Sequence, residues 1–308
     1  MRGSLLCAAI VCVAACGRLD FDALPDSRVT SDAAPDTPSR ACPWAANPTI
    51  GPVVRHTELS IARTETDPLL VRGDPLTIYF ARDVSNGPQF DMFVAHRPTV
   101  DLPFNAPQPV AELATVPLNE FAVQLDTTGH GYYVRSPNAG PQDIYELQKD
   151  AGGVLREVRA LTELDTGGPE YDPFSSPDDK TIYFTAGSAN GQDIFFATRA
   201  STSDPWSNVT PFAHNTNGPD GGATLTRDGL VIVWAAEADV LVSSDIYYAT
   251  RSSTSDPWGP KQLLGPGTIS GSEHDLEPGI REDGCELFFA RSPSPTDGNW
   301  DIYSATLQ

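Results

Sequence analysis

The stretch Asp172-Pro173-Phe174-Ser175-Ser176-Pro177-Asp178, with Ile182-Tyr183-Phe184 and Asp193-Ile194-Phe195 after it, decides the fold of this 308-residue chain. Its last part, an Asp–aliphatic–aromatic triplet, occurs five times at spacings of 52, 50, 52 and 56 residues. The triplets begin at Asp91, Asp143, Asp193, Asp245 and Asp301. Each triplet follows an aromatic-rich run, and each run follows a polar turn. Such a regular period indicates one structural unit repeated along the chain.

Short β-branched and aromatic runs between Gly, Pro and Asp turns are typical of β-strands. A unit of about 50 residues holds four of them, which is one propeller blade. We therefore expect an all-β fold, a five-bladed β-propeller with four-stranded antiparallel blades; six blades are the alternative. The last repeat stops at Gln308 after its third strand, and residues 51–59 match the fourth strand of the other repeats. This predicts that the N-terminal strand completes the last blade and closes the ring.

The Asp-Pro motif with the two runs that follow it resembles the WD40-like (PD40) repeat of the TolB-type propeller family. The resemblance covers roughly residues 50–308. It implies the propeller fold, whereas proteins of this kind serve in binding, in scaffolding and in some enzymes. The resemblance therefore leaves the function open.

The N-terminus has the pattern of a processing signal. Arg2 precedes an apolar run over residues 5–15, which is too short to span a membrane. The run ends in Val13-Ala14-Ala15-Cys16, which resembles a bacterial lipoprotein signal and implies cleavage before Cys16 and a lipid on it. Ordinary secretion with cleavage at an A-x-A-like site is the alternative. In bacterial lipoproteins an Asp directly after the lipidated Cys retains the protein at the inner membrane. The resemblance therefore implies that Gly17, at that position, favours the outer membrane within the bacterial cell envelope.

The expected domain organisation follows from these patterns. Residues 1–15 are a signal peptide, residues 16–41 carry the lipid anchor and a disordered stalk, and residues 42–308 form the propeller. The stalk is rich in Asp, Pro, Ser and Thr and has few large apolar side chains, so it cannot bury enough surface to offset its ordering entropy.

Charge narrows the class of partner. The chain has 41 acidic and 20 basic residues, a formal net charge of -21. Such a field repels phosphate backbones, so we expect no nucleic acid as partner. We expect attachment to a membrane through the lipid on Cys16, and we expect a monomer. The sequence does not identify the envelope protein or glycan that would be its partner. No cofactor is expected, although a calcium-like divalent cation is an alternative.

Two cysteines remain after the signal peptide and the lipidated residue, Cys42 and Cys285. Cys285 falls in the turn between the first two strands of the fifth repeat, and Cys42 approaches the closing strand from the same end. Because thiols oxidise outside the cytoplasm, we predict a Cys42–Cys285 disulfide that fastens the ring closure. Two free thiols are the alternative.

An acidic residue stands just ahead of the first strand of every repeat. These residues are Glu65, Glu120, Glu170, Asp220 and Asp275. A second acid follows in three repeats, at Asp67, Asp172 and Glu277. A ring of carboxylates could hold a divalent cation, because hard cations take carboxylate oxygens. We favour the alternative, in which each acid accepts N–H bonds within its own loop, because a feature of every copy is usually what the repeat needs to fold.

Positions at which the repeats differ are the better candidates for binding. At the end of the second strand three repeats carry Arg82, Arg135 and Arg291, which could hold a carboxylate or an anionic sugar or could pair with neighbouring acids. His274 could be a metal ligand or base, or a plain solvated side chain. Trp300 could stack on a sugar or pack between blades.

The sequence contains no G-x-S-x-G, H-E-x-x-H, P-loop or G-x-G-x-x-G motif. We therefore expect a non-catalytic binding or scaffold module outside the cytoplasm. The alternative is a carbohydrate-active enzyme, a glycosidase or lyase, with its site at the channel mouth.

Overall fold

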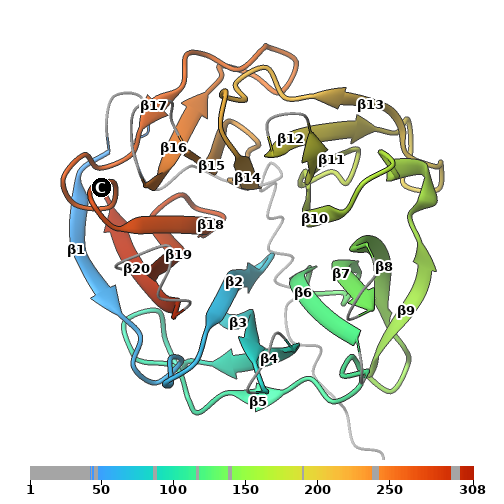
Figure 1. Ribbon diagram of the computed structural model, residues 1–308, viewed down its shortest axis with the longest axis horizontal. Coiled ribbons are helices and arrows are strands. Elements are labelled where there is room, and N and C mark those ends of the chain that lie inside the picture. Colours follow the sequence, from blue (N-terminus) through green and yellow to red (C-terminus); the bar gives the residue numbers. More distant parts are fainter. Residues whose placement is uncertain are drawn as a thin grey trace, which may run out of the picture. The chain divides into compact units, whose positions relative to one another are not determined.

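The computed structural model describes Cys42, Trp44 and residues 48–85, 89–115, 118–137, 141–188, 191–237, 243–292 and 299–308. The signal peptide, Cys16 and the stalk lie outside these residues. The described part forms five four-stranded antiparallel sheets around a central channel, which confirms the five-bladed β-propeller and not the six-bladed alternative (Figure 1). No helix in this part is long and apolar enough to cross a membrane.

The blades follow one another along the chain, and the strands of each blade run in order from the channel outward. Blade one has β2 (Glu65–Val71), β3 (Asp74–Asp83), β4 (Phe90–His96) and β5 (Gln108–Pro109). Blade two has β6 (Leu118–Leu125), β7 (Gly131–Pro137), β8 (Asp143–Lys149) and β9 (Leu155–Ala160), and the 3-10 turn η1 (Thr162–Leu164) follows it. Blade three has β10 (Glu170–Ser175), β11 (Thr181–Ser188), β12 (Gly191–Thr198) and β13 (Ser207–Pro211). Blade four has β14 (Asp220–Leu225), β15 (Val231–Glu237), β16 (Ser244–Thr250) and β17 (Gln262–Leu263). Blade five has β18 (His274–Ile280), β19 (Glu286–Ser292), β20 (Asp301–Leu307) and β1 (Ile50–Arg55).

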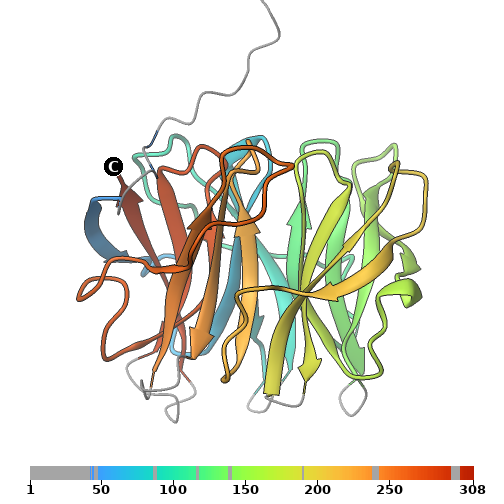
Figure 2. The ribbon, with the colours of Figure 1, turned by 90° about the horizontal axis from the view of Figure 1, so that it is seen from above.

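The strands run between the two faces of the propeller, as the side view shows (Figure 2). We letter the four strands of a blade A to D from the innermost outward. The A–B face is the face at which each innermost strand (A) turns into the second strand (B). The opposite face, at which each innermost strand begins, is the D–A face. The chain ends at Gln308 on the A–B face, at the upper side of Figure 2.

Ring closure uses the N-terminal strand as predicted. β1 pairs antiparallel with β20, with Val53 opposite Ala305 and Arg55 opposite Tyr303. Reciprocal backbone hydrogen bonds between Thr49 and Gln308, at 2.7 and 2.9 Å, extend this pairing to the last residue of the chain. The first and the last described strands therefore lie in one sheet.

A disulfide joins Cys42 to Cys285 in the β18–β19 turn on the A–B face. Next to it the indole of Trp44 is buried, and its Nε1 donates to the carbonyl of Gly284 at 2.9 Å. The same ring meets Tyr248 of blade four edge-on, with ring centroids 5.2 Å apart. The segment before β1 is thus held covalently and by aromatic packing.

Aromatic side chains fill the spaces between blades. Tyr132 of blade two shares one buried cluster with Ile182 and Trp206 of blade three. The near-identical segments 197–206 and 249–258 build the same contact in two blades, because Arg199 lies 4.0 Å over Trp206 and Arg251 lies 4.1 Å over Trp258. Each blade therefore buries its apolar faces against its neighbours.

Candidate functional site

The ring of five acids lies at the starts of the innermost strands, and all five side chains are buried. In blades two, three and four the acid accepts hydrogen bonds from the backbone N–H and the hydroxyl of a threonine in its own loop. The three pairs are Glu120 with Thr115, Glu170 with Thr166 and Asp220 with Thr216. In blades one and five the acid instead pairs with an arginine of its own blade. Each acid thus has a structural role in its own blade.

Burial raises the pKa of these carboxyl groups. The pKa reaches about 7 for Glu65 and Glu120 and about 6 for Asp220 and Asp275, in each case chiefly because burial penalises the charged form. The guanidinium of Arg82 counters this rise at Glu65. Proton uptake near neutral pH is therefore built into the ring.

Each of the three arginines pairs with an acid of its own blade. Arg82 Nε donates to Glu65 at 2.9 Å, and Arg291 donates to Asp275 at 2.6 and 2.9 Å. Arg135 departs from the pattern, because it pairs with Glu157 on β9 at 3.1 Å and lies 4.4 Å over the ring of Tyr145. The guanidinium groups find their partners among neighbouring acids, so we do not place a ligand on them.

His274, the first residue of β18, and Trp300, just ahead of β20, lie together in blade five, with ring centroids 6.4 Å apart in an edge-on arrangement. His274 is buried, and its Nδ1 accepts the backbone N–H of Ser244 at 3.3 Å. The carbonyl of Trp300 accepts the backbone N–H of Glu65 at 2.8 Å, which ties the end of blade five to the start of blade one. Both residues therefore contact neighbouring blades.

The second acids meet in the channel. Each innermost strand has a bulge, and two residues after its ring acid the backbone φ is positive. These residues are Asp67, Ala122, Asp172, Gly222 and Glu277, and all of them line one narrow part of the channel, which we call the waist. The cavity at the waist is about 20 Å³. That volume holds about one water molecule.

The carboxyl groups at the waist are mutually coupled. Glu277 Oε2 accepts the backbone N–H of Asp67 at 2.7 Å, and Asp172 accepts the hydroxyl of Thr185 at 2.9 Å. Burial and then the nearby charge of Asp172 raise the pKa of Glu277 to about 8. Burial and then the charges of Glu277 and Asp172 also raise the pKa of Asp67 well above its usual range. Protons therefore stay on part of this cluster at neutral pH.

A cavity among the described residues opens on the A–B face. It has a volume of about 270 Å³, and Leu69, Phe174 and Ile280 form its apolar wall. Arg227, Arg281 and Glu282, which are at least partly exposed, stand at its rim, and the buried Arg72 also lines it. Sequence reasoning placed ligands at the other face and missed this cavity. The sequence does contain a sign of this cavity, because the turn between the first and second strands differs between repeats. Three blades have Arg72, Arg227 and Glu282 at the position where the other two have Thr127 and Pro177.

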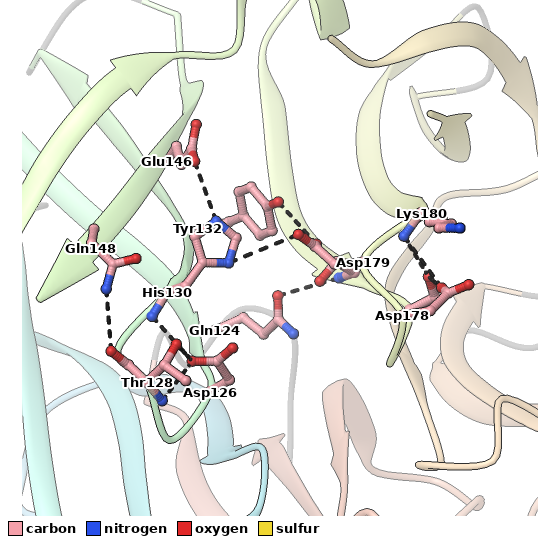
Figure 3. Close-up of polar contacts among 12 residues, drawn as sticks. Gln124, Asp126, Thr128, His130, Tyr132, Glu146, Gln148, Asp178, Asp179 and Lys180 are labelled. Carbon is pink, nitrogen blue, oxygen red and sulfur yellow. Dashed lines mark hydrogen bonds and ion pairs between the residues drawn. The ribbon is translucent and has the colours of Figure 1, made fainter. Parts of the chain in front are cut away.

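A charged network on the A–B face also escaped the sequence analysis. His130 Nε2 lies 3.2 Å from Glu146 in its own blade, and His130 Nδ1 lies 3.9 Å from Asp179 in blade three (Figure 3). Tyr132 donates to Asp179 at 3.0 Å, and Arg199 pairs with the same carboxylate. The hydrogen bond to Glu146 raises the pKa of His130. This network joins blades two and three through a titratable group.

No protein-family model matches the sequence, and no curated protein is similar to it. Similar solved structures do exist. TolB from Acinetobacter baumannii is 13% identical with a TM-score of 0.50, and the alignment covers 82% of this chain and 56% of that one, so this chain spans little more than half of TolB.

Two glycosidases are similar to the same extent. A thermostable family-43 glycoside hydrolase is 15% identical with a TM-score of 0.53, over 82% of this chain and 92% of that one. The catalytic domain of the GH62 α-L-arabinofuranosidase of Coprinopsis cinerea is 11% identical with a TM-score of 0.53, over 88% and 98%. Identities this low establish a shared fold and no more, so this chain has a β-propeller fold that TolB and these glycosidases share.

Proposed function

We propose that the protein is a non-catalytic binding or scaffold module of the bacterial cell envelope. The observation that carries the proposal is the A–B face cavity, which combines an apolar wall with a charged rim. Apolar centres with polar rims and arginine contacts are the usual anatomy of a protein-binding hot spot. Arg227 is exposed at this rim, where a partner can reach it.

The partner is an envelope protein or glycan that inserts an apolar group between Leu69, Phe174 and Ile280. Affinity capture from envelope extracts tests this with three forms of the full-length protein: wild type, Arg227→Glu and Arg135→Glu. Arg135 lies toward the D–A face, so its variant is the matched control. We expect Arg227→Glu to lose the partner and Arg135→Glu to keep it. Equal recovery with all three forms would reject the A–B face as the binding surface.

Membrane attachment through a lipid on Cys16 is part of the same proposal, with the outer membrane as the location. It is supported by the apolar run that ends in Val13-Ala14-Ala15-Cys16. Metabolic labelling with a radioactive fatty acid should label the wild type and leave Cys16→Ala unlabelled. Label retained in Cys16→Ala would contradict the lipid anchor, and ordinary secretion would then be the better explanation.

A carbohydrate-active enzyme is the second candidate, and the carboxyl cluster at the waist is the observation that favours it. Glycosidases use two carboxyl groups about 5–10 Å apart with separated pKa values. Against this, a cavity of about 20 Å³ at the waist has no room for a sugar ring. Hydrolysis of arabinan or xylan oligosaccharides by the wild type, and its loss in Glu277→Gln, would replace our proposal with the enzyme.

A further inference from the structure

Each junction between blades brings two acids close together. The first is the Asp of the Asp–aliphatic–aromatic triplet, and the second is the ring acid of the following blade. The five pairs are Asp91 with Glu120, Asp143 with Glu170, Asp193 with Asp220, Asp245 with Asp275 and Asp301 with Glu65. In every pair the charge of the first acid adds to burial in raising the pKa of the second. The two carboxylates of a pair therefore repel each other unless a cation lies nearby.

The junction that closes the ring supplies that cation twice. Arg55 pairs with Asp301 at 2.8 Å, and Arg82 pairs with Glu65 at 2.9 Å. The next pair back along the chain has one arginine, because Arg291 binds Asp275. These junctions show that the position between the two acids accommodates positive charge.

At the junctions ahead of blades two and four, no arginine among the described residues forms an ion pair with either acid, although the charge of Arg135 lowers the pKa of Glu120 and that of Lys261 lowers the pKa of Asp220. One oxygen of Glu120 takes the bonds from Thr115, and one oxygen of Asp220 takes the bonds from Thr216. The other oxygens, Glu120 Oε2 and Asp220 Oδ1, are buried and have no hydrogen-bond partner. Both side chains are at most 1% exposed.

The opposite acid of each pair shows the same feature. Asp91 Oδ1 and Asp193 Oδ1 are also buried without a hydrogen-bond partner. Orphaned carboxylate oxygens are rare in folded proteins because burying them costs free energy. Four of them belong to two of the five acid pairs, at the same position of the repeat, which points to a common cause.

We propose that each of these two junctions binds a divalent cation of the calcium type, one between Asp91 and Glu120 and one between Asp193 and Asp220. Hard cations take carboxylate oxygens at about 2.3–2.6 Å and complete their shell with carbonyl and water oxygens. No group of three or more His, Cys, Asp or Glu side chains is arranged for a metal in the described part of the chain, so each site has two carboxylates. So few charged ligands imply weak binding, with a Kd of about 10⁻⁴–10⁻³ M.

The cation would do between these blades what Arg55 and Arg82 do at the closing junction: it would join the third strand of one blade to the innermost strand of the next. The sites lie at the D–A ends of β4 and β12, away from the A–B face cavity. This inference rests on the fold alone and does not depend on the proposed function.

Thermal unfolding of the full-length protein in detergent tests the inference at pH 7.5. We compare 10 mM CaCl2, EDTA, and NaCl at matched ionic strength, because a chain of net charge -21 gains some stability from any salt. With a Kd in the stated range, calcium should raise the wild-type midpoint by about 5 °C or more above the NaCl sample. The variant Glu120→Gln/Asp220→Asn keeps the shape and the threonine bonds, and it should lose this increment.

Glu65→Gln is the matched control, since it removes a ring acid that an arginine already neutralises. Its midpoint should fall in every buffer, while its calcium increment stays at the wild-type value. Calorimetric calcium titration gives a second readout: the wild type should bind two ions, and Asp91→Asn and Asp193→Asn one each. No calcium increment in the wild type, which would leave protons as the neutralising species, or an unchanged ion count in both variants, would overturn the inference.

Discussion

Cys42 and Cys285, 243 positions apart in the sequence, are joined by a disulfide with their Cα atoms 5.3 Å apart. The bridge fastens the segment ahead of β1 to the turn that precedes β19, both in the blade that closes the ring. Covalent linkage over so long a loop limits the freedom of the unfolded chain. It also acts where a propeller opens most easily, because β1 is the only strand of blade five that comes from the other end of the chain.

Removing this bridge should weaken the fold. We expect Cys42→Ser/Cys285→Ser to lose about 2–4 kcal/mol of unfolding free energy. At roughly 2–4 °C per kcal/mol the unfolding midpoint should fall by about 5–15 °C. Differential scanning calorimetry measures this, and a strong reductant added to the wild type should have the same effect. Equal midpoints for the two proteins would show that the closure does not depend on the bridge.

Arg82 and Arg135 hold the same repeat position but should differ in their effect on stability. Arg82→Met leaves the fully buried Glu65 without its partner, which should cost about 3–5 kcal/mol. Arg135→Met breaks a pair whose side chains are 26% and 32% exposed, and it should cost at most about 1 kcal/mol. Urea unfolding of both variants makes the comparison. A second variant, Glu65→Gln/Arg82→Met, should recover part of the loss; two equal single losses would contradict the assigned pairing.

Stability should fall as pH rises because of Glu277. Its pKa is about 8 in the folded protein against an ordinary 4.5, so the folded state binds the proton more tightly. Between these two values the unfolded chain releases the proton first, and the unfolding free energy falls with pH. Glu277→Gln imitates the protonated form and should flatten this slope. Urea titrations at pH 5, 6, 7 and 8 measure it, and parallel wild-type and variant curves would contradict the role of Glu277.

His130 should add a further pH dependence in the same direction. Its folded pKa lies above the ordinary 6.5 because of Glu146, so its contribution to stability is fully present below pH 6.5. That contribution is lost as pH rises through the folded pKa. His130→Gln should therefore be less stable than wild type at pH 5.5 and closer to it at pH 8.5. An equal stability difference between His130→Gln and the wild type at both pH values would contradict this role of His130.

Much of the fold could be predicted from local patterns. Aromatic-rich runs, polar turns and the Asp–aliphatic–aromatic triplet occur within each repeat, so the five blades and the closing strand follow from the period. The structural role of the five ring acids could be anticipated for the same reason, since Thr166 and Thr216 stand only four residues ahead of the acids they bind. Contacts between residues this close in the chain can be predicted from the spacing of those residues in the sequence.

Contacts between strands far apart in a repeat, and contacts between blades, could not be predicted in this way. Arg82 and Arg135 look equivalent in the sequence, yet Arg135 turns to Glu157 because β9 brings that carboxylate close to it. The orphaned oxygens of Asp91 and Glu120 lie at a blade junction, and the A–B face cavity lies among turns of blades one, four and five. Electrostatic pairing and cavity volume depend on separations of a few ångströms between side chains. Only the pairing of strands within a blade and the packing of one blade against the next set those separations.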